Sequence, residues 1–168
     1  MIRLTTPISA STAATLRVGD TVTISGTILC GRDAVLPKVV ALCEQGKADS
    51  LGVDLHGQVV FHTAVSPAGV GPTSSNKLEI EASIEPLSQA GVKLHLGKGR
   101  LKPETVAALA RENAVYAVIP PVTALLEGKT LEKRLVAFPE LGMEALYALQ
   151  VEDYPAIIAA AQGGSIYD

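Results

Sequence analysis

The stretch "DTVTISGTILCGRDAVLPKVVALCEQG", residues 20–46, combines two hydrophobic periods and decides the fold. In its first part Val22, Ile24 and Ile28 recur at even spacing among small polar residues, which is typical of a half-buried strand. After "GRD", the apolar residues recur at helical spacing, with Asp33 as the expected N-cap. A strand that leads directly into an amphipathic helix predicts an α/β domain with parallel strands.

The remainder of the chain continues this alternation. Strands are expected over residues 58–65, 92–96 and 114–120, with helices over 78–90 and 101–113 between them. Three further short strands are expected over residues 134–139, 145–153 and 156–161. We therefore predict an α/β fold with a mixed sheet, formed by one domain over residues 12–168 after a short arm over residues 1–11.

Composition excludes several classes of function. Hydrophobic residues make up 48% of the 168 residues and aromatic residues only 4%, which fits a core of aliphatic side chains. The net charge is −3 and basic residues are scattered, so nucleic acid is not an expected partner. No apolar run reaches the roughly 18 residues that a membrane span needs, and the N-terminus lacks a signal peptide's apolar core. We expect a cytoplasmic protein without membrane contact.

The two cysteines, Cys30 and Cys43, fit neither a disulfide framework nor a metal-binding CxxC motif. We interpret both as buried thiols in a reducing compartment, and we expect no metal site in this chain.

Polar segments follow three of the predicted strands. Loops at the carboxyl ends of strands are where open α/β sheets bind ligands. Arg32, Lys77 and Lys98 provide cations there, and Thr73 and Ser74 provide hydroxyl groups, a combination suited to a small dicarboxylate. The three segments are residues 31–33, 71–74 and 97–100.

Each segment has a simpler interpretation when it is taken alone. Asp33 can be only a helix cap, the Gly71–Pro72 pair only a turn, and Lys98 only a solvated lysine. The occurrence of all three together favours a binding site. Phosphate binding through the glycines has weaker support, because neither GxGxxG nor GxxxxGK[ST] is present.

Four segments, taken in order, carry a family resemblance. They are "SGTILCGRDAVLPK", "GVGPTSSNK", "HLGKGRL" and the tail "ALYALQVEDYPAIIAAAQGGSIYD". The first resembles a strand–GRDA–helix segment, the second a GPTT-x-x-R loop, the third a GKG segment, and the tail a closing segment. All four belong to the β subunit, or C-terminal domain, of class I iron–sulfur fumarate hydratases and L-tartrate dehydratases. The resemblance runs from about residue 16 to residue 168.

The resemblance implies a swivelling β/β/α domain that closes over a larger α subunit. That subunit would hold a 4Fe–4S cluster through three cysteines and leave one iron open to the substrate. The implied reaction is the reversible dehydration of a small 2-hydroxy dicarboxylate of the malate/fumarate or tartrate type. Two cysteines cannot supply three thiolates, so this chain is expected to lack the cluster and to be inactive alone. A homodimeric contact within a hetero-oligomer is also expected.

The resemblance also assigns roles to residues. Arg32, Lys77 and Lys98 would bind the substrate carboxylates with Ser74, and Thr73 stands where the family places a proton-transfer residue. A threonine hydroxyl is a poor base at pH 7, so this role needs activation by a neighbour. The residues that would shape the loops are Gly31, Gly71, Pro72, Gly97 and Gly99.

Two departures from the family pattern leave a second function open. Lys77 stands where the family usually has arginine, and Leu36 stands where a histidine generally follows GRDA. A lysine cannot hold a carboxylate through a two-point fork. The alternative is therefore a non-catalytic partner or an anion-binding paralogue with the same fold. The sequence leaves open the substrate, the partner, the stoichiometry and the roles of His62 and His95, whose side chains we expect to bond to the backbone.

Overall fold

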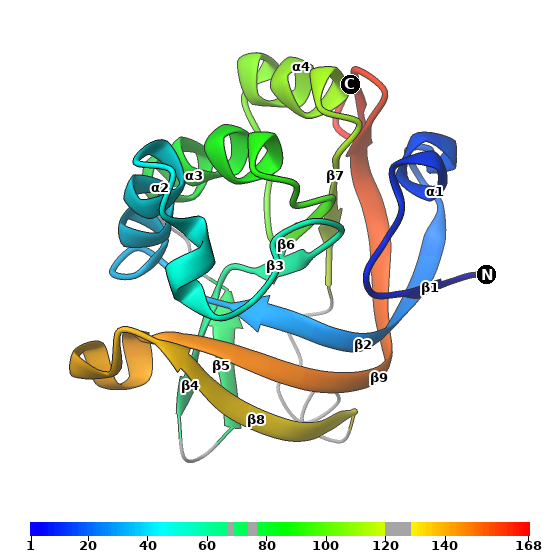
Figure 1. Cartoon of the computed structure of the whole chain (residues 1–168). Helices are drawn as coiled ribbons and strands as arrows, with labels where there is room; N and C mark the ends of the chain where they lie inside the picture. Colours follow the sequence, from blue (N-terminus) through cyan, green and yellow to red (C-terminus); the bar gives the residue numbers. More distant parts are fainter. Residues whose placement is uncertain (67–68, 74–76, 120–128) are drawn as a thin grey trace.

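The computed structural model describes residues 1–66, 69–73, 77–119 and 129–168. Within these residues eight strands form one mixed sheet and two more form a separate hairpin (Figure 1). The strands are β1 (Ile2–Thr5), β2 (Thr21–Cys30), β3 (Val59–Phe61), β4 (Thr63–Ser66), β5 (Gly69–Thr73), β6 (Leu94–Gly97), β7 (Val115–Val118), β8 (Thr130–Ala137), β9 (Leu146–Ala161) and β10 (Gly164–Ser165). The helices are α1 (Ala10–Thr15), α2 (Leu36–Glu44), α3 (Lys77–Gln89) and α4 (Pro103–Arg111), with 3₁₀ turns η1 (Ala48–Leu51) and η2 (Pro139–Glu144). The predicted α/β class with a mixed sheet is confirmed.

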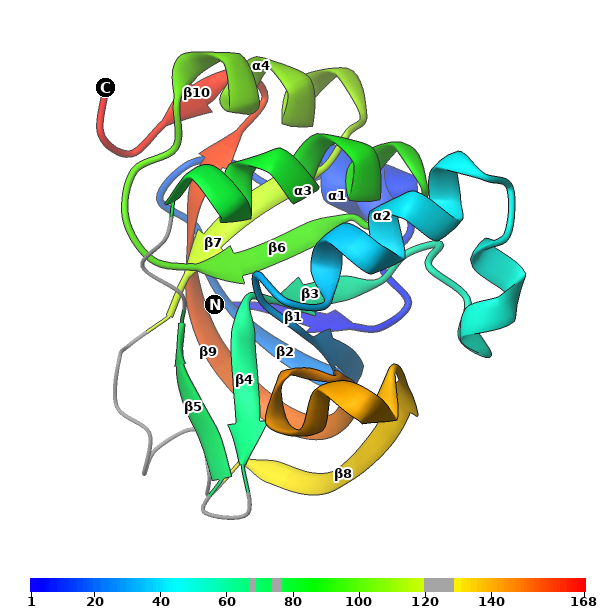
Figure 2. The ribbon, with the colours of Figure 1, turned by 90° about the vertical axis from the view of Figure 1, so that its left-hand side faces the viewer.

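Five strands run parallel as neighbours, in the order β1, β2, β3, β6 and β7. Parallel neighbours cannot be joined by a tight turn, so the chain crosses back over the sheet between them. It does so through α2 after β2, through α3 before β6, and through α4 before β7. Figure 2 shows β3, β6 and β7 side by side beneath these helices. The ends of β2, β3 and β6 therefore share one edge of the sheet, which we call the carboxyl edge: residues 31–33, 62–63 and 97–100.

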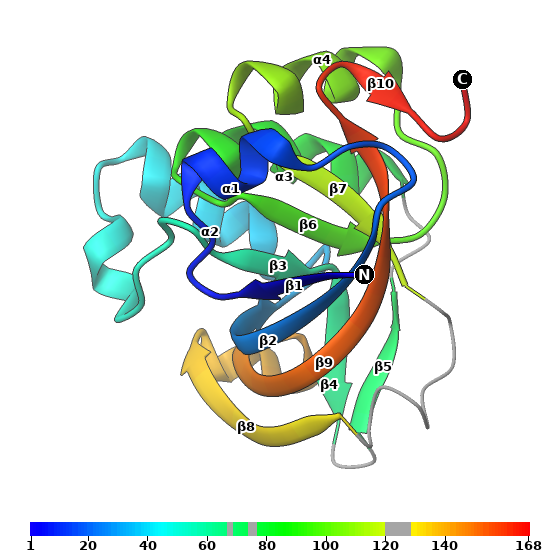
Figure 3. The ribbon, with the colours of Figure 1, turned by 90° about the vertical axis from the view of Figure 1, so that its right-hand side faces the viewer.

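The long strand β9 closes the sheet into a ring (Figure 3). It pairs antiparallel with β2 along most of its length and with β7 near its end. The sequence predicted two strands in place of β9, over residues 145–153 and 156–161, and that prediction is wrong. The pairing register with β2 shifts there, and the N–H of Asp153 donates to Ser25 Oγ at 3.0 Å. A bulge of this kind bends a strand without ending it.

Aliphatic side chains from alternate strand positions fill the interior of the ring. Val22, Ile24 and Ile28 are all fully buried there, as the spacing in the sequence predicted. Phe61 and Tyr154 meet edge to face in the same group, with ring centroids 6.4 Å apart. Successive strand residues point to opposite faces, so the intervening apolar residues lie outside the ring.

The helices cover that outer face. Leu29 and Val60 pack with Leu87 beneath α2 and α3, while Tyr116 packs with Leu109 beneath α4. Among the described residues, no helix is long and apolar enough to span a bilayer.

Helix α2 begins later than the sequence predicted. Asp33 does not cap it, because the helix begins at Leu36 and the N-cap position is Val35. Pro37 lies in the first turn, where its missing N–H leaves no helical bond unmade. The carbonyl of Arg32 accepts hydrogen bonds from the N–H groups of Val35 and Leu36 at 3.2 and 2.9 Å. The backbone of Arg32 is therefore fixed at the junction between β2 and α2.

The first eleven residues, expected as an arm, contribute β1 and the start of α1. Leu4 and Ile8 are buried with the interior group, and β1 pairs with β2. These residues are thus packed as part of the sheet, while the domain limits themselves stay a prediction.

The strand predicted over residues 58–65 is divided in two. Strand β3 ends at Phe61, and β4 begins at Thr63. His62 separates them, and β4 leaves the main sheet to pair with β5. The hairpin β4–β5 therefore starts at the carboxyl edge.

Candidate functional site

Three glycines shape the carboxyl edge. A Cβ atom on Gly31 would lie 2.6 Å from Cγ1 of Val35, and one on Gly97 would lie 3.1 Å from the hydroxyl oxygen of Tyr116. Gly99 has a φ of +85°, which favours glycine, and its carbonyl accepts a hydrogen bond from the Tyr116 hydroxyl at 3.2 Å. These contacts give a physical reason for glycine at all three positions.

Arg32 lies two residues past the end of β2 and binds the carboxylate of Glu144. Its Nη2 donates to Oε1, and its Nε donates to Oε2 at 3.4 Å. The two side chains keep 31% and 28% of their surface exposed. The hydrogen bond and the charge of Glu144 raise the pKa of the Arg32 guanidinium, so its positive charge is permanent. Sequence reasoning missed Glu144 because it is 112 residues away along the chain.

Lys98 follows the end of β6 and is exposed. Strands β2 and β6 flank β3, so their ends lie roughly 10 Å apart at the usual strand spacing. Long side chains at two such positions can approach the same small dicarboxylate from either side.

The segment "GVGPTSSNK", predicted as a substrate loop, is partly a strand. It forms β5 and then leads into α3, and β5 pairs with β4 so that Thr73 lies opposite Thr63. The backbone of Thr73 is therefore close to the carboxyl edge. Of the residues predicted there, Gly71, Pro72 and Thr73 lie in β5, Lys77 is the first residue of α3, and Ser74 lies outside the described residues.

A chain of buried hydrogen bonds runs from the carboxyl edge to α3. The distance from His62 Nε2 to His95 Nδ1 is 3.2 Å, and that from His95 Nε2 to Ser88 Oγ is 2.9 Å. Ser88 Oγ donates to the carbonyl of Ile84 at 2.7 Å. Both rings are fully buried. The expectation that these histidine side chains bond to the backbone is wrong: they bond to each other and to α3. We call His62, His95 and Ser88 the histidine relay.

The relay fixes where each proton lies. Burial lowers the pKa of His62 to about 4, with Asp33 acting in the opposite direction; burial and then His62 lower the pKa of His95. Both rings are therefore neutral at pH 7, with one N–H each. Ser88 gives its only proton to a carbonyl, so His95 must donate from Nε2, and His62 must donate from its own Nε2 to His95. Nδ1 of His62 is left as a bare acceptor, and it has no hydrogen-bond partner in the described part of the chain.

Neither cysteine is placed to act as a thiolate ligand. Cys30 is buried, which raises the pKa of its thiol strongly, and burial followed by Glu44 raises the pKa of Cys43. Among the described residues, no three His, Cys, Asp or Glu side chains are grouped as a metal ion requires.

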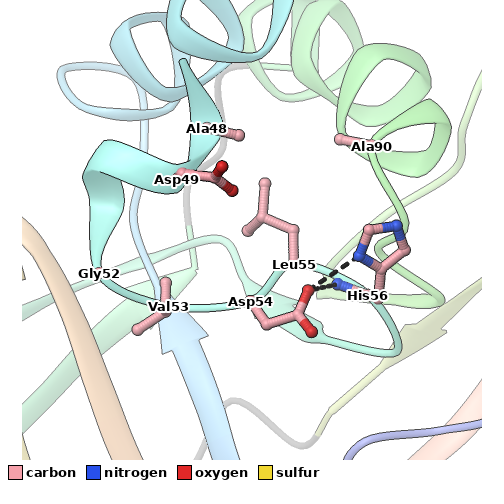
Figure 4. Close-up of a pocket in the computed structure, with 8 residues that line it drawn as sticks. All are labelled: Ala48, Asp49, Gly52, Val53, Asp54, Leu55, His56 and Ala90. Atoms are coloured by element: carbon pink, nitrogen blue, oxygen red, sulfur yellow. Dashed lines mark hydrogen bonds and ion pairs between the residues drawn. The ribbon is translucent and has the colours of Figure 1, made fainter. Parts of the chain in front are cut away.

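Two hollows lie at the opposite edge of the sheet, before β3 and β6. One of about 490 Å³ is lined by Asp49, Asp54 and His56 (Figure 4). There Asp54 accepts hydrogen bonds from the His56 backbone at 2.9 Å and pairs with its ring at 2.8 Å. A neighbouring hollow of about 530 Å³ shares His56. Two carboxylates in one wall would repel a dianion, so we place the candidate site at the carboxyl edge, where Arg32 and Lys98 are cationic.

Comparison with known proteins agrees with the resemblance read from the motifs. The family described as "Fumarase C-terminus" matches residues 1–168. The chain is 30% identical to the L(+)-tartrate dehydratase subunit beta of Escherichia coli K12 over 168 residues, covering 94% of this chain and 81% of that protein. It is 28% identical to the anaerobic class I fumarate hydratase of the same organism over 155 residues, covering 88% of this chain and 28% of that enzyme.

The match spans the whole chain and includes each segment of the carboxyl edge. The predicted resemblance is therefore confirmed. This chain belongs to the fumarase C-terminus family, together with the β subunit of L(+)-tartrate dehydratase and the corresponding part of class I fumarate hydratase.

Proposed function

We propose that this chain is the β component of a two-component iron–sulfur hydro-lyase. Its substrate is a small 2-hydroxy dicarboxylate of the malate/fumarate or tartrate type, which the assembled enzyme dehydrates reversibly. One observation carries the proposal: at the carboxyl edge, Arg32 already holds a carboxylate through two N–H groups. The names of the relatives, a tartrate dehydratase subunit and a fumarate hydratase, support the class of reaction.

The residues of this chain do not fit an iron–sulfur cluster. The sequence has two cysteines where a cluster with one open iron needs three thiolates. One of the two, Cys30, is fully buried as an uncharged thiol. The cluster therefore belongs to an α subunit, and the designation "subunit beta" of the relative supports such a partner.

This chain's part in the reaction is to bind charge and to move a proton. Dehydration removes a proton from the carbon next to a carboxylate, and the intermediate places extra negative charge on that group. Fixed cations stabilise this charge most, so Arg32, Lys77 and Lys98 are proposed to bind the carboxylates. Ser74 is proposed to assist binding and Thr73 to transfer the proton. Lys77 begins α3, whose N-terminus adds a favourable field for an anion.

The partner is proposed to cover exposed apolar side chains. On β8, Leu131 and Leu135 are 62% and 45% exposed, and near the C-terminus Ile166 and Tyr167 are also exposed. Among the described strands β8 pairs with β9 alone, so its second edge is open. We propose a hetero-oligomer that also contains a contact between two copies of this chain.

The test is turnover by the reconstituted complex. The purified chain is mixed with its cluster-bearing α partner, and the formation or loss of the enoate is followed by absorbance with L-malate, fumarate, L-tartrate and related dicarboxylates. Turnover of at least one of them supports the proposal. A tight complex without turnover on any substrate would replace it with the alternative, a non-catalytic anion-binding paralogue.

A further inference from the structure

Glu144 contacts Arg32 on one side of the guanidinium group only. Its two oxygens meet Nε and Nη2, the side next to the aliphatic stem. A guanidinium group carries five N–H donors in one plane. Within the described residues, the hydrogen bonds of this side chain use only Nε and Nη2, which leaves the Nη1–Nη2 end for a second two-point contact with a carboxylate.

The backbone is fixed on both sides of this contact. Arg32 is held by the hydrogen bonds that its carbonyl accepts at the start of α2. Glu144 ends η2, where the N–H of Ala145 donates to the carbonyl of Gly142 at 3.1 Å. Leu146 follows as a buried residue at the start of β9, and its neighbour Tyr147 pairs with Cys30 of β2. The pairing of β9 with β2 thus brings Glu144 to Arg32.

We propose that Glu144 is a positioning residue, which holds Arg32 so that the free end of its guanidinium group meets a substrate carboxylate. The inference rests on the proposed function, because it assigns the carboxylate to the substrate. A free arginine side chain must lose much rotational freedom when it binds, and a side chain already held by Glu144 has lost most of it. Groups that orient a metal ligand commonly change metal affinity or activity by about 10- to 100-fold when they are removed, and we expect a carboxylate that orients a binding arginine to act on a similar scale.

Electrostatics alone predicts the opposite effect. Glu144 is a negative charge next to an anion site, so its removal should tighten the binding of a dianion if the charge were its only contribution. Positioning predicts weaker binding. The direction of the change therefore separates a positioning residue from a carboxylate that competes with the substrate for Arg32.

The test compares Glu144→Ala with Glu85→Ala in the reconstituted enzyme. Glu85 pairs with Arg111 at 2.7 Å on the exposed surface between α3 and α4, so both variants remove one arginine-bound carboxylate and change the net charge equally. We expect Glu144→Ala to raise KM by about tenfold with a smaller change in kcat, and Glu85→Ala to change neither. Glu144→Gln, which keeps one acceptor oxygen, should lie between Glu144→Ala and the unmodified enzyme. A lower KM in Glu144→Ala, or one equal to that of Glu85→Ala, overturns the inference.

A second measurement on the chain without its partner keeps the inference separate from the proposed function. The Nε–H signal of Arg32 is followed by NMR while L-tartrate or fumarate is added. We expect this signal to be sharp before the dicarboxylate is added and to shift on addition in the unmodified chain and in Glu85→Ala. In Glu144→Ala it should respond only at a much higher concentration of the dicarboxylate. This result supports the inference even if no complex turns over. Failure of the Arg32 signal to respond in the unmodified chain would overturn it, whatever the activity of the complex.

Discussion

At the residue scale, the candidate site depends on cations whose backbone is held by the ends of strands. Arg32 lies at a fixed junction and Lys98 follows Gly97, where a Cβ atom would lie only 3.1 Å from the Tyr116 ring and hydroxyl group. The two positions lie two strands apart, on either side of the end of β3. A small dianion between them can be bound at both ends.

Neutral replacements of these cations should therefore affect turnover far more than stability. Methionine keeps much of the packing of the aliphatic stem and removes the charge. We expect Arg32→Met or Lys98→Met to lower kcat of the assembled enzyme by roughly 100-fold, because the intermediate loses a fixed counter-charge. Steady-state kinetics and urea unfolding of the same samples measure both quantities. Arg111→Met is the control, because Arg111 pairs with Glu85 between α3 and α4. Rates near those of the unmodified enzyme for both test variants would show that these loops face away from the reaction.

The sequence singled out Arg32 as a candidate cation but not its contact with Glu144. Arg32 stands out locally, because it follows a strand and precedes a helix. Glu144 has no such signal, since the contact joins residues 112 positions apart and depends on how β9 pairs with β2. A candidate residue can be singled out from local sequence, whereas its contacts with distant residues depend on the tertiary fold.

At the element scale, the histidine relay joins three elements: the end of β3, the strand β6 and the helix α3. His62 donates to His95, His95 to Ser88, and Ser88 to the carbonyl of Ile84 within its own helix. The relay thus ties α3, which begins at Lys77, to the strand end beside the carboxyl edge. It also holds the His62 ring within the electrostatic influence of Asp33, which acts to raise its pKa against the larger effect of burial.

Replacing Ser88, the last member of the relay, should move the proton of each histidine ring from one nitrogen to the other. In Ser88→Ala the Nε2 proton of His95 loses its acceptor, and a buried donor without a partner is costly. Moving the proton of each ring to Nδ1 keeps the His62–His95 hydrogen bond with its direction reversed, and the field of Asp33 favours positive charge on the His62 ring. Long-range ¹H–¹⁵N spectra of the ring nitrogens should show Nε2–H in both histidines of the unmodified chain and Nδ1–H in the variant. Ser83→Ala, which alters another buried serine of α3, should leave the rings unchanged. Nδ1–H in the unmodified chain would contradict the assigned proton positions.

The same histidines should make stability depend on pH. Burial lowers the pKa of His62 from 6.5 to about 4 and lowers that of His95 as well. At pH values between the folded and unfolded pKa of His62, the unfolded chain binds more protons than the folded chain. The free energy of unfolding therefore falls as the pH falls. The contribution of His62 to the free energy of unfolding is fully present above pH 6.5. About 3 kcal/mol of it is lost as the pH falls toward 4. Urea unfolding at pH 7, 6 and 5 should show this slope, and the double variant His62→Leu/His95→Leu should reduce it. An unchanged slope in the double variant would mean that other groups cause it.

The elements themselves were predicted unevenly, for physical reasons. Alternation of apolar residues located β2, because that strand has one face in the core and one that is partly covered. The same pattern does not show that the chain leaves the sheet at His62, since the residues on either side are all apolar or small. Nor does it show that β9 continues past Pro155, because a bulge paired with β2 allows the strand to bend. Pairing between distant strands decides both outcomes.

At the scale of the whole molecule, the strands enclose a core, and the candidate site is proposed to act together with groups of a partner. The ring of strands encloses a continuous apolar interior, so the chain has the core that an independent domain needs. Its candidate site offers cations but no group of thiolates among the described residues. The exposed apolar side chains of β8 lie beside a strand edge that has no pairing partner in the described part of the chain, and a second chain can cover such a surface.

The isolated chain should therefore fold without iron and have no activity. We expect the purified protein to be colourless, to contain no stoichiometric iron or acid-labile sulfide, and to show a cooperative unfolding transition. Activity should appear only when the α partner with its cluster is added, and it should saturate at a fixed ratio of the two chains. Metal analysis, visible absorption and titration of activity against added partner measure these properties.

A variant on β8 separates association from folding in this experiment. Leu131 is 62% exposed, so Leu131→Glu should leave the unfolding midpoint of the isolated chain nearly unchanged. If the partner or a second copy covers β8, burying the new charge without a counter-ion should weaken the complex by at least tenfold, measured by sedimentation or by the activity titration. Ala107→Glu on α4 is the control, because that residue is exposed on a helix away from β8. Equal association of both variants would place the interface elsewhere on the molecule. A visible charge-transfer band with bound iron in the isolated chain would contradict the proposal that the α subunit alone holds the cluster.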